Sequence, residues 1–95
     1  MTPAVETLTN QALPILRRHG VVRAGVFGSQ LRGTAGLESD LDLVVEFETG
    51  RSLLDLVALE QALTAALGLR VDVSTYRSLH PMLRERILAE EQQIL

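Results

Sequence analysis

Three aspartates have the types and spacing of a metal-binding site. Asp40 and Asp42 are two residues apart at the start of an apolar run, and Asp72 interrupts a later run, Val-Asp-Val. Side chains two apart on a strand point to the same face, so Leu41, Leu43 and Val45 are expected to point to the opposite face, into the core. Neighbouring ionised carboxylates repel each other unless a cation lies between them. A lone carboxylate in an apolar strand is also costly without compensation. The pattern therefore predicts that all three aspartates share magnesium, which prefers such hard oxygen ligands.

Gly28 and Ser29 have the character of a phosphate-binding turn. They directly follow the β-rich run over residues 21–27 and precede a short turn or helical start. Free backbone N–H groups at a helix start bind phosphate, the glycine permits close approach, and the serine hydroxyl adds a donor. Phosphate and metal are thus expected to meet at one edge of a sheet. Metal ions there would bridge the phosphates, activate an attacking hydroxyl and stabilise the leaving group.

The elements that must position these residues follow from hydrophobic periodicity and turn residues. They are a helix over 3–19 that ends at Gly20, strands over 21–27 and 41–47, a helix over 52–67 that ends at Gly68, a strand over 70–75 and a helix from 81. Pro14 should kink or divide the first helix. This order predicts one α/β (α+β) domain over residues 1–95, with helices packed on a small mixed sheet of about three strands. Whether the third strand is parallel or antiparallel to its neighbour stays open.

Composition excludes several classes of protein. The 95 residues have a net charge of −3, and all nine basic residues are arginine, so the broad basic stripe of a nucleic-acid-binding protein is missing. Cysteine is absent, no apolar run approaches the ~20 residues of a membrane span, and the start of the chain is unlike a signal peptide. We expect a cytoplasmic protein with no membrane contact and no direct nucleic-acid contact.

The helix over 52–67 is apolar around so much of its surface that it is buried on several sides or meets a partner.

The segment GVFGSQLRGTAGLESDLDLVV resembles the signature of the minimal nucleotidyltransferase (MNT) domains of the DNA polymerase β-like superfamily. The matching residues are Gly28, Ser29, Arg32, Gly33, Ser39, Asp40, Asp42, Leu43 and Val45, and Asp72 matches the family's third carboxylate. The resemblance implies the nucleotidyltransferase fold, ATP as substrate, two Mg²⁺ ions and transfer of AMP. Members of this length resemble antitoxins that pair with HEPN-domain ribonuclease toxins, some of which they adenylylate on a tyrosine.

Several alternatives stay open at this point. The chain could transfer AMP to a partner protein, or it could be a non-catalytic antitoxin that neutralises a toxin by contact alone. A small-molecule transferase is disfavoured, because 95 residues leave no second lobe for an acceptor. Arg32 could lie on the surface or reach a phosphate or a partner. Tyr76, the only tyrosine, is expected to be an amphipathic surface residue.

Overall fold

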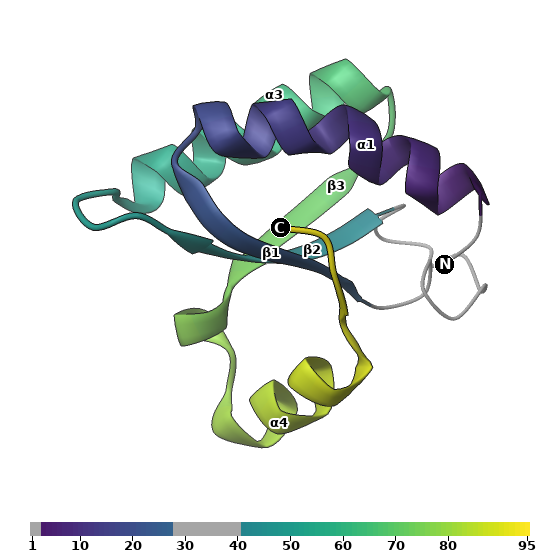
Figure 1. The fold of residues 1–95 in the computed structure, drawn as a ribbon. Coiled ribbons are helices and arrows are strands. Elements are labelled where there is room, and N and C mark those ends of the chain that lie inside the picture. The colour runs from purple at the N-terminus through teal and green to yellow at the C-terminus, as the bar shows by residue number, and fades with distance from the viewer. Residues whose placement is uncertain (1–2, 28–40) are drawn as a thin grey trace.

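The computed structural model describes residues 3–27 and 41–95. These residues form a four-stranded sheet with α1 and α3 side by side on one face and α4 beyond the other face (Figure 1). The elements are α1 (Pro3–Arg18), β1 (Val21–Phe27), β2 (Leu41–Phe47), α3 (Leu53–Leu67), β3 (Val71–Thr75), the 3₁₀ turn η1 (Tyr76–Ser78), α4 (Pro81–Glu90) and β4 (Gln92–Gln93). The mixed α/β fold expected from the sequence is thereby confirmed.

Of the two expected effects of Pro14, a kink or a division, the division does not occur, because α1 is continuous from Pro3 to Arg18. Proline removes one N–H and releases the carbonyl of the residue four positions earlier. That residue is Asn10, and both Asn10 and Pro14 are exposed, so water can satisfy the released carbonyl. The helix ends as expected, since Gly20 adopts a positive φ of 82°.

The sheet has the strand order β3-β2-β1-β4. β2 pairs antiparallel with β1 and parallel with β3, which decides the orientation that the sequence left open. The expectation of about three strands missed β4, whose two glutamines pair antiparallel with Gly25 and Val26 of β1. Two glutamines have no strand periodicity, and they pair because the chain returns to β1 after α4.

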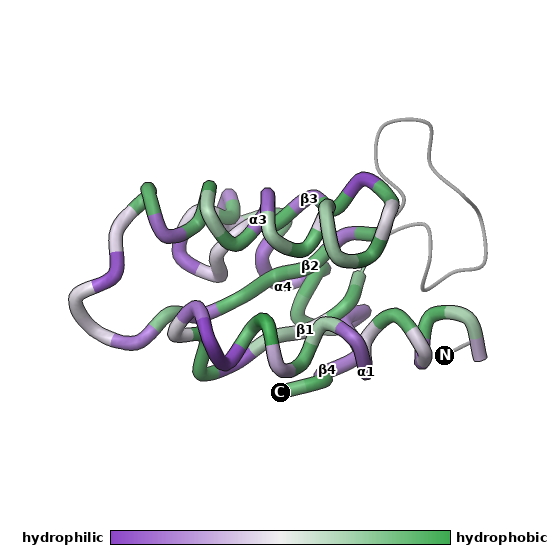
Figure 2. The backbone as a smooth tube through the Cα atoms, turned by 90° about the horizontal axis from the view of Figure 1, so that it is seen from above, coloured by the Kyte–Doolittle hydropathy of each residue, from purple (hydrophilic) through white to green (hydrophobic). Residues whose placement is uncertain are grey.

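The hydrophobic core lies between the sheet and the two helices on its covered face. Leu41, Leu43 and Val45 of β2 are completely buried there, as their alternation with Asp42 predicted. Figure 2 shows apolar stretches along α1, α3 and the strands of the sheet. In the parts of the chain that the structure describes, no helix is long and apolar enough to cross a membrane.

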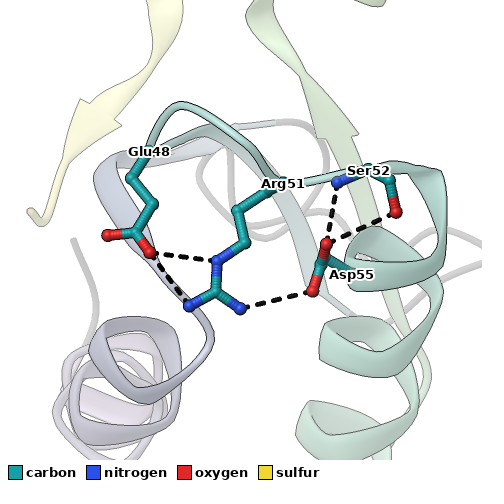
Figure 3. Close-up of polar contacts among 4 residues, drawn as sticks. All are labelled: Glu48, Arg51, Ser52 and Asp55. Carbon is teal, nitrogen blue, oxygen red and sulfur yellow. Dashed lines mark hydrogen bonds and ion pairs between the residues drawn. The ribbon is translucent and has the colours of Figure 1, made fainter.

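The turn from β2 into α3 is held by a small polar network (Figure 3). The Asp55 carboxylate accepts a hydrogen bond of 2.7 Å from the Ser52 N–H, which would otherwise lack a partner at the helix start. Arg51 bridges the two ends of the turn, with 3.0 Å to Glu48 and 3.3 Å to Asp55. Its guanidinium also lies against Gly20, where an added Cβ would be 2.8 Å from Arg51 Cζ. The Glu48 N–H donates to the Gly20 carbonyl at 2.8 Å, and this hydrogen bond joins the turn before α3 to the end of α1.

We predict that Asp55→Ala lowers the melting temperature by a few degrees at neutral pH. The hydrogen bond from the Ser52 backbone, followed by Arg51, holds the pKa of Asp55 below its ordinary value of 3.8. A carboxyl group whose pKa is lowered by folding stabilises the protein above its unfolded pKa, and this stabilisation is lost as pH falls through the folded pKa. The difference in melting temperature from the wild type should therefore shrink below about pH 4. Thermal melts between pH 2 and pH 7 test this, with Gln61→Ala on the exposed side of α3 as control; a constant difference would contradict it.

Candidate active site

Asp42 and Asp72 lie directly opposite each other on the parallel strands β2 and β3. Paired residues on adjacent strands project to the same face, and neighbouring strands are about 4.8 Å apart. Leu41 and Leu43 point into the core, so both aspartates lie on the opposite sheet face, away from α1 and α3. Phe27, the last residue of β1, pairs with Asp42 and completes this row across three strands. The structure thus brings together two of the three predicted carboxylates.

The two carboxylates differ in exposure, and this corrects one sequence argument. Asp72 was expected to need compensation because it interrupts an apolar strand. Its neighbours Val71 and Val73 are indeed buried, but Asp72 itself is exposed. Water can therefore solvate its charge without a metal. Asp42 is half-buried. The observation in favour of a joint site is accordingly the pairing of Asp42 and Asp72 in register, whereas the apolar neighbours of Asp72 give no support to it.

The remaining predicted site residues, Gly28, Ser29, Arg32 and Asp40, lie outside the described residues and stay predictions. The described residues on either side of them are informative. Phe27 pairs with Asp42, so residue 27 is next to the strand that starts at residue 41. β1 therefore ends, and β2 begins, at the carboxylate row. Within residues 3–27 and 41–95 themselves, no group of three or more acidic or histidine side chains is placed so that it could hold a metal ion.

The next row on the same sheet face is covered by the C-terminal part of the chain. It consists of Gly25 on β1, Val44 on β2 and Ser74 on β3. A Cβ at Gly25 would collide with the Glu91 carboxylate and lie 3.0 Å from its Cδ. Val44 is fully buried although it points away from the helices. The row of Asp42 and Asp72 is therefore bordered by a row on which Glu91 packs closely. This packing requires glycine at position 25, because any side chain there would collide with Glu91.

Glu91 connects three separate segments at this border. Its side chain is 6% exposed, forms an ion pair of 3.0 Å with Arg23 of β1 and accepts a 2.7 Å hydrogen bond from the Tyr76 hydroxyl. The Arg23 guanidinium also lies 4.6 Å from the Tyr76 ring centroid. Tyr76 is 6% exposed, so the expectation that it is a surface residue is wrong. Its hydroxyl found a partner across 15 residues of sequence, which no local pattern indicates.

Sequence reasoning missed this cluster, although one signal of it was present. A glycine inside a strand often marks the close approach of another group, and Gly25 is such a glycine. It could have indicated that something packs on the open face beside the carboxylates. The identity of that group, Glu91, was not readable from the sequence.

Comparison with known proteins gives consistent results. The nucleotidyltransferase domain family matches residues 10–94. A Methanocaldococcus jannaschii chain assigned as a protein adenylyltransferase is 47% identical over 91 residues, which cover 96% of this chain and 98% of that one. A solved minimal nucleotidyltransferase has a TM-score of 0.81 at 47% identity and covers 94% of this chain and 91% of its own. A chain from a toxin–antitoxin crystal structure with AMP-PNP has a TM-score of 0.77 at 26% identity, with coverage of 92% and 72%.

We predict that Tyr76 stays protonated in the folded protein well above pH 10. Burial, followed by the hydrogen bond to Glu91, raises the pKa of the phenol far above its ordinary value of 10.0. A group whose pKa is raised by folding stabilises the fold below its unfolded pKa, so the free energy of unfolding should fall as pH rises above about 10. The phenolate absorbance reports on Tyr76 alone, because the chain has one tyrosine.

The matched variant for this titration is Glu91→Gln, which keeps a hydrogen-bond acceptor but removes the negative charge. In this variant the Tyr76 phenol should ionise at a lower pH than in the wild type, as long as the protein stays folded. A wild-type phenol that ionises near pH 10 without unfolding would contradict the buried, Glu91-bound position.

Proposed function

Because this chain belongs to the nucleotidyltransferase domain family, we propose that it transfers AMP from ATP to a hydroxyl group of a partner protein. The observation that carries the proposal is the pairing of Asp42 with Asp72 on the open sheet face. The relative assigned as a protein adenylyltransferase, which matches this chain almost from end to end, supports a protein acceptor.

Asp40, Asp42 and Asp72 are the proposed ligands of two Mg²⁺ ions. The donor set fits magnesium, because the two described members are carboxylates on adjacent strands and neither is enclosed by the core. Asp40 precedes β2 by one residue and is two residues from Asp42, which favours the same face. Bound magnesium would neutralise phosphate charge and increase the acidity of the attacking hydroxyl.

The chain's own residues have distinct roles in the proposed transfer. The backbone N–H groups of Gly28 and Ser29 hold the β- and γ-phosphates, together with the Ser29 hydroxyl. Arg32 is a further candidate for phosphate binding. The acceptor oxygen forms a bond to the α-phosphorus of ATP, and the bond from that phosphorus to the pyrophosphate oxygen breaks. The acceptor hydroxyl loses its proton to the exposed Asp72 carboxylate or to water. The products are the AMP ester of the acceptor, pyrophosphate and one proton.

Exposed apolar side chains support a protein partner. The first turns of α3 expose Leu53 by 72% and Leu54 by 80%, which confirms that this helix has more apolar surface than the core uses. On α4, which has no buried residue, Met82 is 81% exposed. Contiguous exposed apolar surface is typical of interaction sites, and Leu53 and Leu54 are neighbours on α3, whereas α4 lies beyond the other sheet face. We propose a HEPN-type toxin as the partner and acceptor, consistent with the toxin–antitoxin structure among the structural neighbours.

A second candidate function is an antitoxin that acts by contact alone. The same exposed residues of α3 and α4 favour it, because they need no intact catalytic site. The two candidates differ in what the aspartates contribute. In the contact-only antitoxin, replacement of Asp42 leaves toxin neutralisation unchanged, whereas in the transferase it abolishes the modification.

We predict that Asp42→Asn lowers AMP transfer at least about 10-fold, since loss of a direct ligand should cost no less than loss of an outer-shell partner. The folded domain should persist, because the substitution removes charge repulsion opposite Asp72 and keeps the side-chain size. Glu46→Gln is the matched control, as Glu46 lies on the same strand and the same face, four residues away. Labelled ATP measures transfer, and thermal melting measures folding. Wild-type transfer by Asp42→Asn would rule out this mechanism.

We also predict a stable complex with the protein of the neighbouring reading frame, and the addition of AMP to that partner when ATP and Mg²⁺ are supplied. Mass spectrometry of the purified complex detects the adduct, and Asp42→Asn provides the inactive comparison. Leu54→Ser should weaken the complex, whereas Ala66→Ser at the opposite end of α3 should not, since only the first turns expose large apolar side chains. A complex that never gains mass would favour the contact-only antitoxin.

A further inference from the structure

The edge strand β3 is bound by side chains of α3 along its outer side. β3 is the last strand of the sheet on the side away from β1, so alternate backbone groups face outward. The Val73 N–H donates to Glu60 Oε2 at 3.2 Å, and the Val71 N–H donates to Thr64 Oγ1 at 3.4 Å. Glu60 and Thr64 are one helical turn apart, which matches two outward N–H groups spaced two residues apart on the strand.

These two hydrogen bonds flank Asp72. The Leu41 N–H of β2 donates to the Arg70 carbonyl at 3.1 Å, so the backbone of residue 70 faces β2. The backbone N–H and C=O groups of successive residues point alternately to the two sides of a strand. Those of residue 72 therefore also point to β2, while those of residues 71 and 73 point to α3. The backbone around Asp72 is thus bound on two sides. β2 pairs with the backbone of Asp72 itself, and side chains of α3 bind the N–H groups of Val71 and Val73.

Glu60 forms the stronger of these two hydrogen bonds. A carboxylate acceptor gives a stronger hydrogen bond than a neutral hydroxyl, and its distance is also the shorter, 3.2 Å against 3.4 Å. Glu60 is half-buried, so this bond is partly shielded from water. Val73 is the middle residue of β3 and directly follows Asp72, so this bond holds the strand next to the carboxylate.

We propose that Glu60 is a positioning residue for the metal site: by binding the Val73 N–H, it fixes the backbone on which Asp72 is presented opposite Asp42. The Asp72 carboxylate is exposed, so core packing does not fix its position, and the backbone must do so. Metal ligands need to be held within about 0.5 Å of their productive geometry. This inference rests on the proposed function, since it concerns the same carboxylates.

The test compares Glu60→Met with Glu60→Gln in the full chain. Both variants remove one negative charge, and both side chains are unbranched and suit a helix. Only glutamine retains an oxygen that can accept the Val73 N–H. Gln61→Met, at the exposed neighbouring position, is the control for the substitution itself. The readouts are Mn²⁺ affinity, measured with the metal alone, and hydrogen exchange of the Val73 amide.

In Glu60→Met we expect faster exchange at Val73 and a dissociation constant for Mn²⁺ that rises about 10-fold, as for other residues that support metal ligands. Glu60→Gln should recover most of both losses, and Gln61→Met should match the wild type. Equal Mn²⁺ affinity in Glu60→Met and the wild type would overturn the positioning role and leave the proposed function intact. Equal losses in Glu60→Met and Glu60→Gln would also overturn it, because charge and not hydrogen bonding would then be the cause.

The proposed function is tested separately in the same samples. Asp42→Asn should abolish the Mn²⁺ binding of the wild type. If the wild type binds no Mn²⁺, the metal site fails and the role of Glu60 fails with it. If Mn²⁺ binds and responds to Glu60 but no AMP is transferred, the positioning role is supported and the proposed transferase activity is what fails.

Discussion

The central position of β2 is the constraint on which the rest of this structure depends. β2 pairs with both β1 and β3, and its two faces have opposite requirements. Leu41, Leu43 and Val45 are completely buried against the helices, while Asp42 is on the other face. A shift of one residue in register would bury Asp42 and expose the leucines. The apolar face of β2 therefore fixes which face presents the carboxylate, and the cost of burying that charge forbids the alternative.

The two faces of the sheet are covered by different means. α1 and α3 cover one face with a continuous apolar core (Figures 1 and 2). Among residues 3–27 and 41–95, the other face is covered only in part, by the C-terminal segment that Glu91 anchors to Arg23 and Tyr76. This cluster stops one row short of Asp42 and Asp72. Because the described part of this cover ends before the aspartates, Asp72 is exposed and Asp42 is only half-buried.

The strands of the two aspartates differ in how many neighbouring strands they pair with. Asp42 lies on a strand with hydrogen-bonded neighbours on both sides, whereas Asp72 lies on an edge strand. α3 supplies the missing neighbour to β3 through the side chains of Glu60 and Thr64. The same bonds occupy outward N–H groups that another strand could otherwise pair with. One helix thus packs the core, steadies the second carboxylate and protects the sheet edge.

The sequence alone determined the elements that depend on local patterns. Alternation predicted the buried face of β2, and the glycines at positions 20 and 68 marked the ends of α1 and α3, where both adopt positive φ. The motif around Asp40 and Asp42 predicted the family that the comparisons show. Tertiary structure decided what depends on distant contacts. The parallel pairing of β2 with β3, the addition of β4, and the burial of Tyr76 on Glu91 all join segments that are far apart in the chain. Such contacts arise from the packing of whole elements, for which periodicity and capping residues give no signal.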